Sequence, residues 1–305
     1  MTPEWQRKDL TLCGIRVSIL DRPAATSEKP AILLLHGLVA EGATFRKLIE
    51  ALPPDRRLIA VDLPGAGYSE RPLHADVSFA GMANVIQAAI STLGLHQPIL
   101  LGHSHGGAVA LRLAATHHAL LSGLILLCPA HPFSRYEYKL VRFYLSSAGR
   151  LFARCLPLIP RPIMLFIFKN MPGGVSRASF NFDDLEPYLH TLRAPGTVPH
   201  LLRLLSTWQS DMYLLGGDLQ STPLTTPTLL LWGTRDLIVP LKTASRLAGH
   251  IARAKLIPLP GAGHLPNEEY PQECAAAITT WLAEAELHRL TVHGENHRKS
   301  PSVRP

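Results

Sequence analysis

The sequence predicts an α/β fold in which a mostly parallel sheet carries helices on both faces. Short apolar runs that suit buried strands recur along the chain, and segments of helical composition separate them. Such alternation is typical of parallel strands connected through helices. The wholly apolar run at residues 31–35 fits a strand covered on both faces. One long interval without a strand, residues 131–221, interrupts the rhythm and predicts a helical cap.

The individual elements follow from local sequence in chain order. Residues 10–13 and 15–20 predict a hairpin that turns near Gly14, and we expect these strands to form an antiparallel edge. Six further strands, which make the predicted sheet eight-stranded, are expected at residues 31–35, 58–61, 98–101, 124–127, 228–232 and 254–259. Helical spacing or composition predicts helices at residues 45–52, 77–93, 108–117, 242–250 and 271–287.

These elements divide the chain into a core, a cap and two ends. We expect residues 10–130 and 222–287 to form the core. Residues 131–221 would then cover the carboxyl edge of the sheet, where open α/β sheets bind ligands. Residues 1–9 are predicted to be an N-terminal arm, and the polar, basic residues 288–305 a disordered tail.

Composition limits the classes of function. The 305 residues are 47% hydrophobic and 17% charged, a balance typical of a globular enzyme. The chain has no apolar run long enough for a membrane span, no secretory signal at its start and four widely spaced cysteines, so we expect a cytoplasmic protein. The net charge of +7 is concentrated partly in the predicted cap and tail, and we expect no nucleic-acid partner.

The most informative motif is Gly102-His103-Ser104-His105-Gly106, between a predicted strand and a predicted helix. It matches Gly-x-Ser-x-Gly, the sharp turn that exposes a nucleophilic serine at the edge of a sheet. The two glycines leave room for this turn because they have no Cβ. The N-terminus of the following helix favours an anion beside the serine. The alternative is that Ser104 merely caps that helix.

A serine hydroxyl needs a base to take its proton and a third group to orient that base. Asp236 follows the strand at residues 228–232, and His264 follows the strand at residues 254–259. Both therefore lie at the same edge of the sheet as Ser104, and the order serine, acid, histidine is expected for this motif on this architecture. As alternatives, Asp236 could cap a helix, and His264 could be an ordinary loop residue.

The chain carries five motifs in order, namely Leu35-His36-Gly37, residues 62–69, the serine motif, residues 231–236 and Gly261-Ala262-Gly263-His264. Through these motifs it resembles the capped members of the α/β-hydrolase fold superfamily over about residues 10–285. The resemblance implies that Ser104 is the nucleophile, His264 the general base and acid, and Asp236 the orienting carboxylate. It also implies an oxyanion hole made by the backbone N–H groups of Leu38 and His105.

Three neighbours of these residues are predicted to support the site or the substrate. The family pattern implies that His36 and Gly37 belong to the oxyanion loop, braced by His36, and that His103 flanks the nucleophile. These histidines have no metal-ligand spacing, so no metal is predicted. The glycine pairs at residues 65–67 and 261–263 lack the third glycine of a dinucleotide fingerprint, and we expect no cofactor.

A serine at the motif predicts acyl transfer. Relatives that open epoxides or displace halide carry an aspartate there. We expect a serine hydrolase that cleaves a small-molecule ester or thioester of a hydrophobic acyl group through an acyl-enzyme. Carbon–carbon bond hydrolysis, cofactor-free perhydrolysis and non-catalytic binding remain open, as does the oligomeric state. Basic residues lie among apolar ones in the cap, a pattern that also fits weak contact of the cap with a membrane surface.

Overall fold

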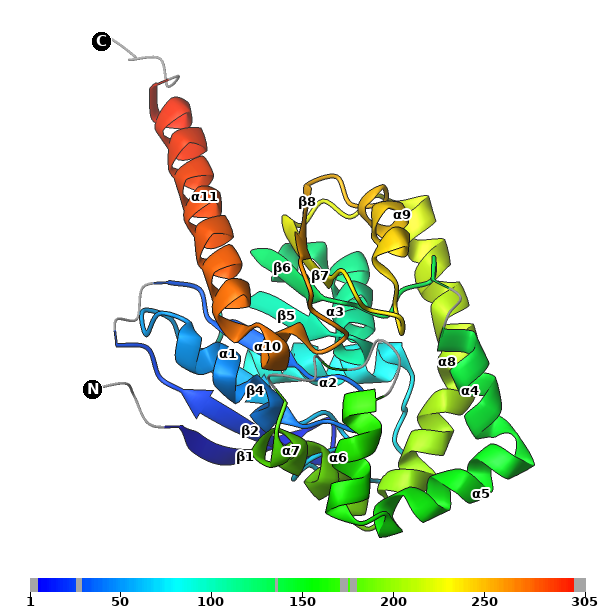
Figure 1. Cartoon of the computed structure of the whole chain (residues 1–305). Helices are drawn as coiled ribbons and strands as arrows, with labels where there is room; N and C mark the ends of the chain where they lie inside the picture. Colours follow the sequence, from blue (N-terminus) through cyan, green and yellow to red (C-terminus); the bar gives the residue numbers. More distant parts are fainter. Residues whose placement is uncertain (1–4, 26–28, 135–136, 171–174, 176–179, 299–305) are drawn as a thin grey trace, which may run out of the picture.

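A central sheet organises the computed structural model, which describes residues 5–25, 29–134, 137–170, 175 and 180–298 (Figure 1). Its eight strands are β1 (Gln6–Leu12), β2 (Ile15–Arg22), β3 (Ile32–Leu35), β4 (Leu58–Val61), β5 (Ile99–His103), β6 (Gly123–Leu127), β7 (Thr228–Gly233) and β8 (Ala254–Leu259). They are ordered β1-β2-β4-β3-β5-β6-β7-β8, and only the pairings of β2 are antiparallel. The predicted fold class is confirmed.

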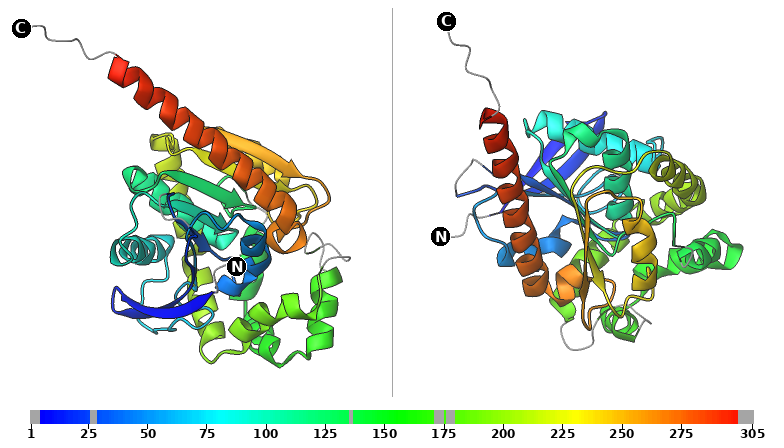
Figure 2. Two further views of the ribbon diagram at one scale, coloured as in Figure 1. Left: turned by 90° about the vertical axis from the view of Figure 1, so that its left-hand side faces the viewer. Right: turned by 90° about the horizontal axis from the view of Figure 1, so that it is seen from above.

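Helices cover both faces of the sheet (Figure 2). Alternate residues of a strand point to opposite faces, so Leu33 and Leu35 of β3 enter one core and Ile32 and Leu34 enter another. The first core includes residues of α2, α3 and α9, and the second includes residues of α1 and α11. These helices are α1 (Arg46–Ala51), α2 (Phe79–Thr92), α3 (His105–Thr116), α9 (Ala244–Ala248) and α11 (Pro271–Arg298), with α10 (Pro266–Glu269) before the last.

Between β6 and β7, the described residues form helices joined by turns, and they contain no strand apart from the isolated bridge of Leu224 with Ile251. The helices include α4 (Glu137–Leu145), α5 (Ser147–Cys155), α6 (Arg161–Asn170), α7 (Phe182–Arg193) and α8 (Thr197–Ser221). Leu185, Leu189 and neighbours form a third core, which also contains Leu265 and Ala40 from the sheet side. Within the described ranges, no helix has both the length and the apolar character needed to cross a bilayer.

Polar contacts attach this helical region to the rest of the molecule. The buried carboxylate of Asp184 in α7 binds Arg46 and lies 2.6 Å from Lys47 Nζ in α1. His190 pairs with the buried Glu41, and Arg71 Nε donates a 2.8 Å hydrogen bond to Thr197 Oγ1. Because a buried carboxylate without partners is costly, these contacts favour one position of α7 over the sheet.

Both predicted chain ends need correction. The first strand begins at Gln6, so most of the described part of the expected N-terminal arm belongs to the sheet. The tail prediction is wrong for residues 288–298, which continue α11, while residues 299–305 lie outside the described residues. Once packing has nucleated a helix, each further residue adds a hydrogen bond, so the helix can extend beyond the part that packs on the core.

Buried neutral histidines predict acid-sensitive stability. Burial lowers the pKa of His103, His105 and His131 to about 3 and that of His200 to about 4. The unfolded chain therefore takes up protons on these groups below about pH 6.5, while the folded chain does not. Their contribution to stability is complete above pH 6.5 and is lost as the pH falls toward 4. Burial raises the pKa of Glu268 to about 8 and also raises the pKa values of Glu41 and Asp211, and these carboxyl groups work in the opposite direction.

We therefore expect the free energy of unfolding, measured in urea, to fall between pH 7 and pH 5. His131→Gln tests one contribution, because an amide can keep the contact that His131 Nε2 makes with Thr243 Oγ1 at 2.9 Å. Removal of one titrating group should reduce the slope of the free energy of unfolding against pH by about 1.4 kcal/mol per pH unit. An unchanged slope in this variant would contradict the assignment.

Candidate active site

Ser104 lies at the sharp turn between β5 and α3. Its backbone φ is 51° and ψ is −115°, a strained conformation for a residue with a side chain. A Cβ on Gly102 would lie 2.5 Å from the carbonyl oxygen of Gly106, and a Cβ on Gly106 would lie 2.3 Å from that of Leu35. The turn therefore requires glycine at both flanking positions, as the motif predicts.

The structure brings together the three residues predicted to carry the chemistry. Ser104 Oγ lies 2.9 Å from His264 Nε2, and His264 Nδ1 lies 2.8 Å from Asp236 Oδ2. An ionised carboxylate only accepts hydrogen bonds, so Nδ1 carries the proton and Nε2 is left to accept from the serine hydroxyl. Asp236 and His264 are buried, and Ser104 is partly exposed. This hydrogen-bond chain can move a proton from the serine to the imidazole.

The carboxylate of Asp236 is fixed by the loop that follows β7. Its Oδ1 accepts hydrogen bonds from the backbone N–H groups of Ile238, at 2.8 Å, and Val239, at 2.9 Å. Oδ2 is thereby left to face His264. Both carboxylate oxygens of Asp236 therefore have partners, and the side chain is held in one orientation.

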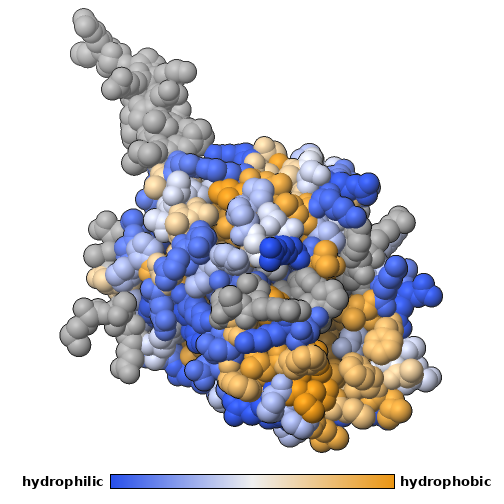
Figure 3. All heavy atoms as spheres, in the orientation of Figure 1, coloured by the Kyte–Doolittle hydropathy of each residue, from blue (hydrophilic) through white to orange (hydrophobic). Residues whose placement is uncertain are grey.

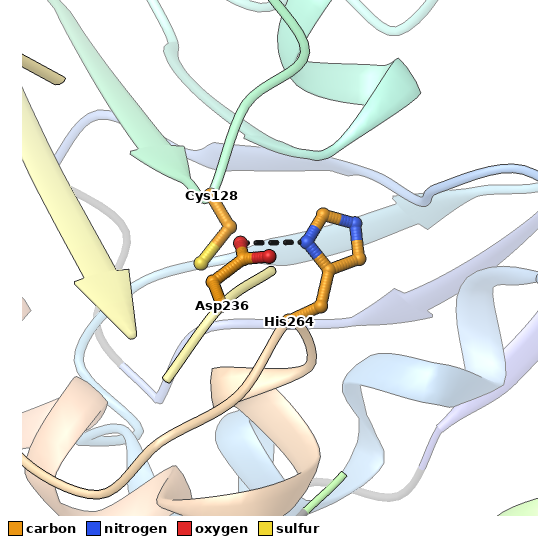
Figure 4. Close-up of side chains that lie close together, drawn as sticks. All are labelled: Cys128, Asp236 and His264. Atoms are coloured by element: carbon orange, nitrogen blue, oxygen red, sulfur yellow. Dashed lines mark hydrogen bonds and ion pairs between the residues drawn. The ribbon is translucent and has the colours of Figure 1, made fainter. Parts of the chain in front are cut away.

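Cys128, directly after β6, is a neighbour that the sequence did not place here. Its sulfur and the ligand atoms of Asp236 and His264 lie within 4.8 Å of one another (Figure 4). Burial, followed by the charge of Asp236, raises the pKa of the Cys128 thiol well above its usual range. The thiol is therefore protonated at neutral pH, and it accepts a 3.4 Å hydrogen bond from the N–H of Gly233.

The geometry of this trio suits a hydrogen bond better than a shared metal. Two ligands of a tetrahedral zinc ion, each about 2.0–2.1 Å from the metal, lie about 3.3 Å apart. His264 Nδ1 and Asp236 Oδ2 are closer than that, at 2.8 Å. The absence of a metal remains a prediction.

The loop that carries His264 is held from both sides. One contact comes from His103, which was predicted only to flank the nucleophile, and the other comes from Glu269, for which no role was predicted. His103 Nε2 donates a 2.7 Å hydrogen bond to the carbonyl oxygen of His264. The buried carboxylate of Glu269 in α10 accepts from the N–H of Gly263 at 3.0 Å and from that of Leu265 at 3.1 Å. In the sequence, nothing separates Glu269 from the adjacent Glu268, so only the folded loop reveals this contact.

We expect Glu269→Ala to lower kcat for the ester hydrolysis that the sequence predicts by about 10²-fold, because a displacement of about 1 Å at a reacting group can cost that much. Glu269→Gln keeps an acceptor for these N–H groups and should retain more activity. The KM should change little, since Glu269 faces the loop rather than the substrate. Equal kcat values in wild type and Glu269→Ala would refute this positioning role.

The loop after β3 lies against the nucleophile. A Cβ on Gly37 would lie 3.3 Å from Ser104 Cβ and 2.9 Å from His103 Nδ1, so only glycine fits. His36 Nε2 accepts a 2.9 Å hydrogen bond from the N–H of Leu63, and its Nδ1 lies 2.8 Å from the carbonyl oxygen of Gly37. These two contacts connect the loop after β3 to the loop after β4 through the His36 ring.

Leu38 and His105, the residues predicted to supply the oxyanion hole, both line one small cavity. Leu38 follows Gly37, and His105 is the first residue of α3, where helical N–H groups have no partner within the helix. The two segments touch, because the backbone of Leu35 and His36 packs against Gly106. A reacting carbonyl at Ser104 would meet the N-terminus of α3, which favours negative charge.

This small cavity of about 30 Å³ adjoins the loop after β3, between the sheet and α8. His105 and His200 line it, and His105 Nε2 has no hydrogen-bond partner among the described residues. The His105 ring instead packs between Phe79 and Trp208. The rest of the lining is mainly apolar and includes Leu38, Val39, Leu63, Met82, Leu201 and Leu204.

Two family models match the chain. The model described as alpha/beta hydrolase fold matches residues 30–158, and the model described as TAP-like protein matches residues 216–297. Together they span the segments that carry Ser104, Asp236 and His264.

The relatives have different named activities. The chain is 25% identical to Epoxide hydrolase 4 of Homo sapiens, over 84% of this chain and 73% of that protein. It is 27% identical to Monoacylglycerol lipase ABHD6 of Homo sapiens, over 89% of this chain and 78% of the lipase. The crystal structure of Cfl2 from Burkholderia cenocepacia has a TM-score of 0.80 at 19% identity, covering 92% of this chain and 99% of Cfl2. This last likeness concerns the fold alone.

Proposed function

Because this chain belongs to the α/β-hydrolase superfamily, we propose that it is a serine hydrolase that cleaves an ester or thioester of a hydrophobic acyl group. The observation that carries the proposal is the hydrogen-bond chain from Ser104 through His264 to Asp236. No metal or cofactor is needed for this chemistry.

In the first half-reaction, His264 Nε2 takes the proton of Ser104 as Oγ bonds to the acyl carbon. The carbonyl electron pair moves onto oxygen, where the N–H groups of Leu38 and His105 stabilise it. Two such donors can each lower the barrier by about 3 kcal/mol. The imidazolium then gives its proton to the leaving alcohol or thiol. Water, activated by the same imidazole, releases the acid from Ser104.

The identity of residue 104 distinguishes this reaction from those named for other relatives. If a serine displaced halide or opened an epoxide, it would form an alkyl ether. An ether has no carbonyl carbon for water to attack, so the enzyme would stop after one turnover. A carboxylate nucleophile would instead form an ester that water can cleave. Ser104 therefore favours an acyl substrate, in agreement with the lipase among the relatives.

A hydrophobic acyl group suits the walls beside the oxyanion loop. Apolar side chains from the loops after β3 and β4, from α2 and from α8 dominate the cavity there. At about 30 Å³ it holds little more than water, so a longer acyl chain requires Leu201 and Leu204 of α8 to move outward.

A panel of p-nitrophenyl esters tests this function. We expect kcat/KM to rise from acetyl to hexanoyl or octanoyl, because burying each added methylene against an apolar wall can contribute about 0.8 kcal/mol to binding. Alkyl halides and epoxides should give no turnover. A steep preference for acetyl would reject the hydrophobic acyl group. Tight retention of ligand without turnover would favour a binding protein instead.

A further inference from the structure

Apolar side chains are exposed over the outer surface of the cap. In Figure 3 hydrophobic residues gather over the region of α4, α5 and α6, at the end of the molecule opposite α11. The exposed fractions reach 79% for Leu158, 67% for Phe166 and 63% for Leu151. Leu140 and Phe143 in α4 and Ile163 in α6 are also exposed. Large apolar groups gathered on one surface indicate an interaction site.

A basic cavity opens beside these side chains. It has a volume of about 570 Å³ and lies between α5 and the turn from α7 to α8. Four arginines line it, namely Arg150, Arg154, Arg193 and Arg203, and no acidic residue is among its lining residues. A cavity of this composition attracts an anion.

These four guanidinium groups have no carboxylate partner among the described residues. Arg193 donates to the carbonyl oxygens of Pro157 and Ile159, and Arg203 donates to those of Pro72 and Ala75. Arg150 Nε donates to the carbonyl oxygen of Leu145. Carbonyl groups orient three of the arginines but leave their positive charge uncompensated. By contrast, Arg161 nearby is paired with Glu186.

Two of the arginines and one of the most exposed apolar residues come from the same helix, α5. In α5, Arg150 and Arg154 are one helical turn apart and line the cavity, whereas Leu151 is exposed beside them. Leu158 follows in η3 (Leu156–Leu158). A phosphate in the cavity would therefore lie next to side chains that prefer hydrocarbon.

We propose that this face of the cap docks on a bilayer that contains anionic phospholipid. A headgroup phosphate binds in the arginine-lined cavity, and the side chains of Leu151, Leu158 and Phe166 enter the boundary between headgroups and acyl chains. Charge argues against a second copy of this chain as the partner. Residues 137–169 contain six Lys or Arg and one acidic residue, so two such faces repel each other.

Sedimentation of the full-length protein with vesicles tests this docking without any turnover. We expect binding to vesicles of phosphatidylcholine with 30% phosphatidylglycerol, weak binding to pure phosphatidylcholine, and loss of binding at high salt. Each neutralised arginine should weaken binding about fivefold, so Arg150→Gln/Arg154→Gln should weaken it about 25-fold. Arg246→Gln, at an exposed site in α9, is the matched control and should bind like wild type.

Substitutions of exposed leucines on the same face of the cap test the apolar contribution. Leu151→Ser/Leu158→Ser should lose binding, whereas Leu151→Phe/Leu158→Phe should retain it. Equal sedimentation of the serine pair, the glutamine pair and wild type would overturn the proposal. Two further results would also overturn it. The first is a protein that does not bind vesicles but self-associates, with the serine pair abolishing the self-association. The second is a protein that binds inorganic phosphate but does not bind vesicles.

Discussion

Ser104→Ala is expected to lower kcat for p-nitrophenyl hexanoate by about 10⁵- to 10⁶-fold, because loss of the nucleophile of such a triad has an effect of this size. The residual rate would come from the oxyanion donors and from substrate binding. Initial rates with purified protein measure the change. Alanine has the same Cβ as serine, so the substitution adds no strain to the turn at residue 104, and the fold should persist.

The thermal unfolding midpoint is the control for Ser104→Ala. An unchanged midpoint with lost activity assigns the effect to the hydroxyl. A fall of less than about tenfold would mean that ester hydrolysis does not proceed through Ser104, and the acyl-enzyme mechanism would be wrong.

Asp236→Asn is expected to lower kcat by about 10⁴-fold with little change in structure. The N–H groups of Ile238 and Val239 hold one oxygen of residue 236, so the amide oxygen takes that place and the NH₂ group faces His264. Nδ1 must then accept a hydrogen bond, and the proton moves to Nε2. In this tautomer His264 can no longer accept the proton of Ser104.

Cys128→Ala provides the comparison for Asp236→Asn, because Cys128 lies beside the same imidazole and carboxylate. Its protonated thiol offers no negative charge to His264, so we expect kcat to change by less than about tenfold. If Cys128→Ala abolished activity and Asp236→Asn did not, the assignment of the acid would be wrong.

The sequence predicts the middle of the sheet well because β3, β4 and β6 are fully buried and consist of apolar residues. Residues 31–35 illustrate this, since the strand at Ile32–Leu35 differs from the prediction by one residue. The ends of the chain were predicted less well. The first strand has exposed residues from Gln6 to Asp9, so no apolar run marks its start. The end of α11 is polar, and polarity alone resembles disorder.

The candidate site also has a part that local sequence predicts and a part that it does not predict. Ser104, Asp236 and His264 each lie in a local pattern at the end of a strand, and parallel strands bring these ends together. The contacts that hold the His264 loop have no local pattern. Glu269 acts through backbone N–H groups, and His103 acts through a carbonyl oxygen 161 positions along the chain. Only tertiary structure creates such pairs. The boundaries of the cap at residues 131 and 221 stay a prediction.

The most direct test is covalent labelling with a fluorophosphonate, followed by intact mass measurement and peptide mapping. The proposed function predicts one adduct per chain, located on Ser104, with much slower labelling of His264→Ala and none of Ser104→Ala. Stoichiometric labelling at another residue, or no labelling of the active wild-type protein, would contradict it.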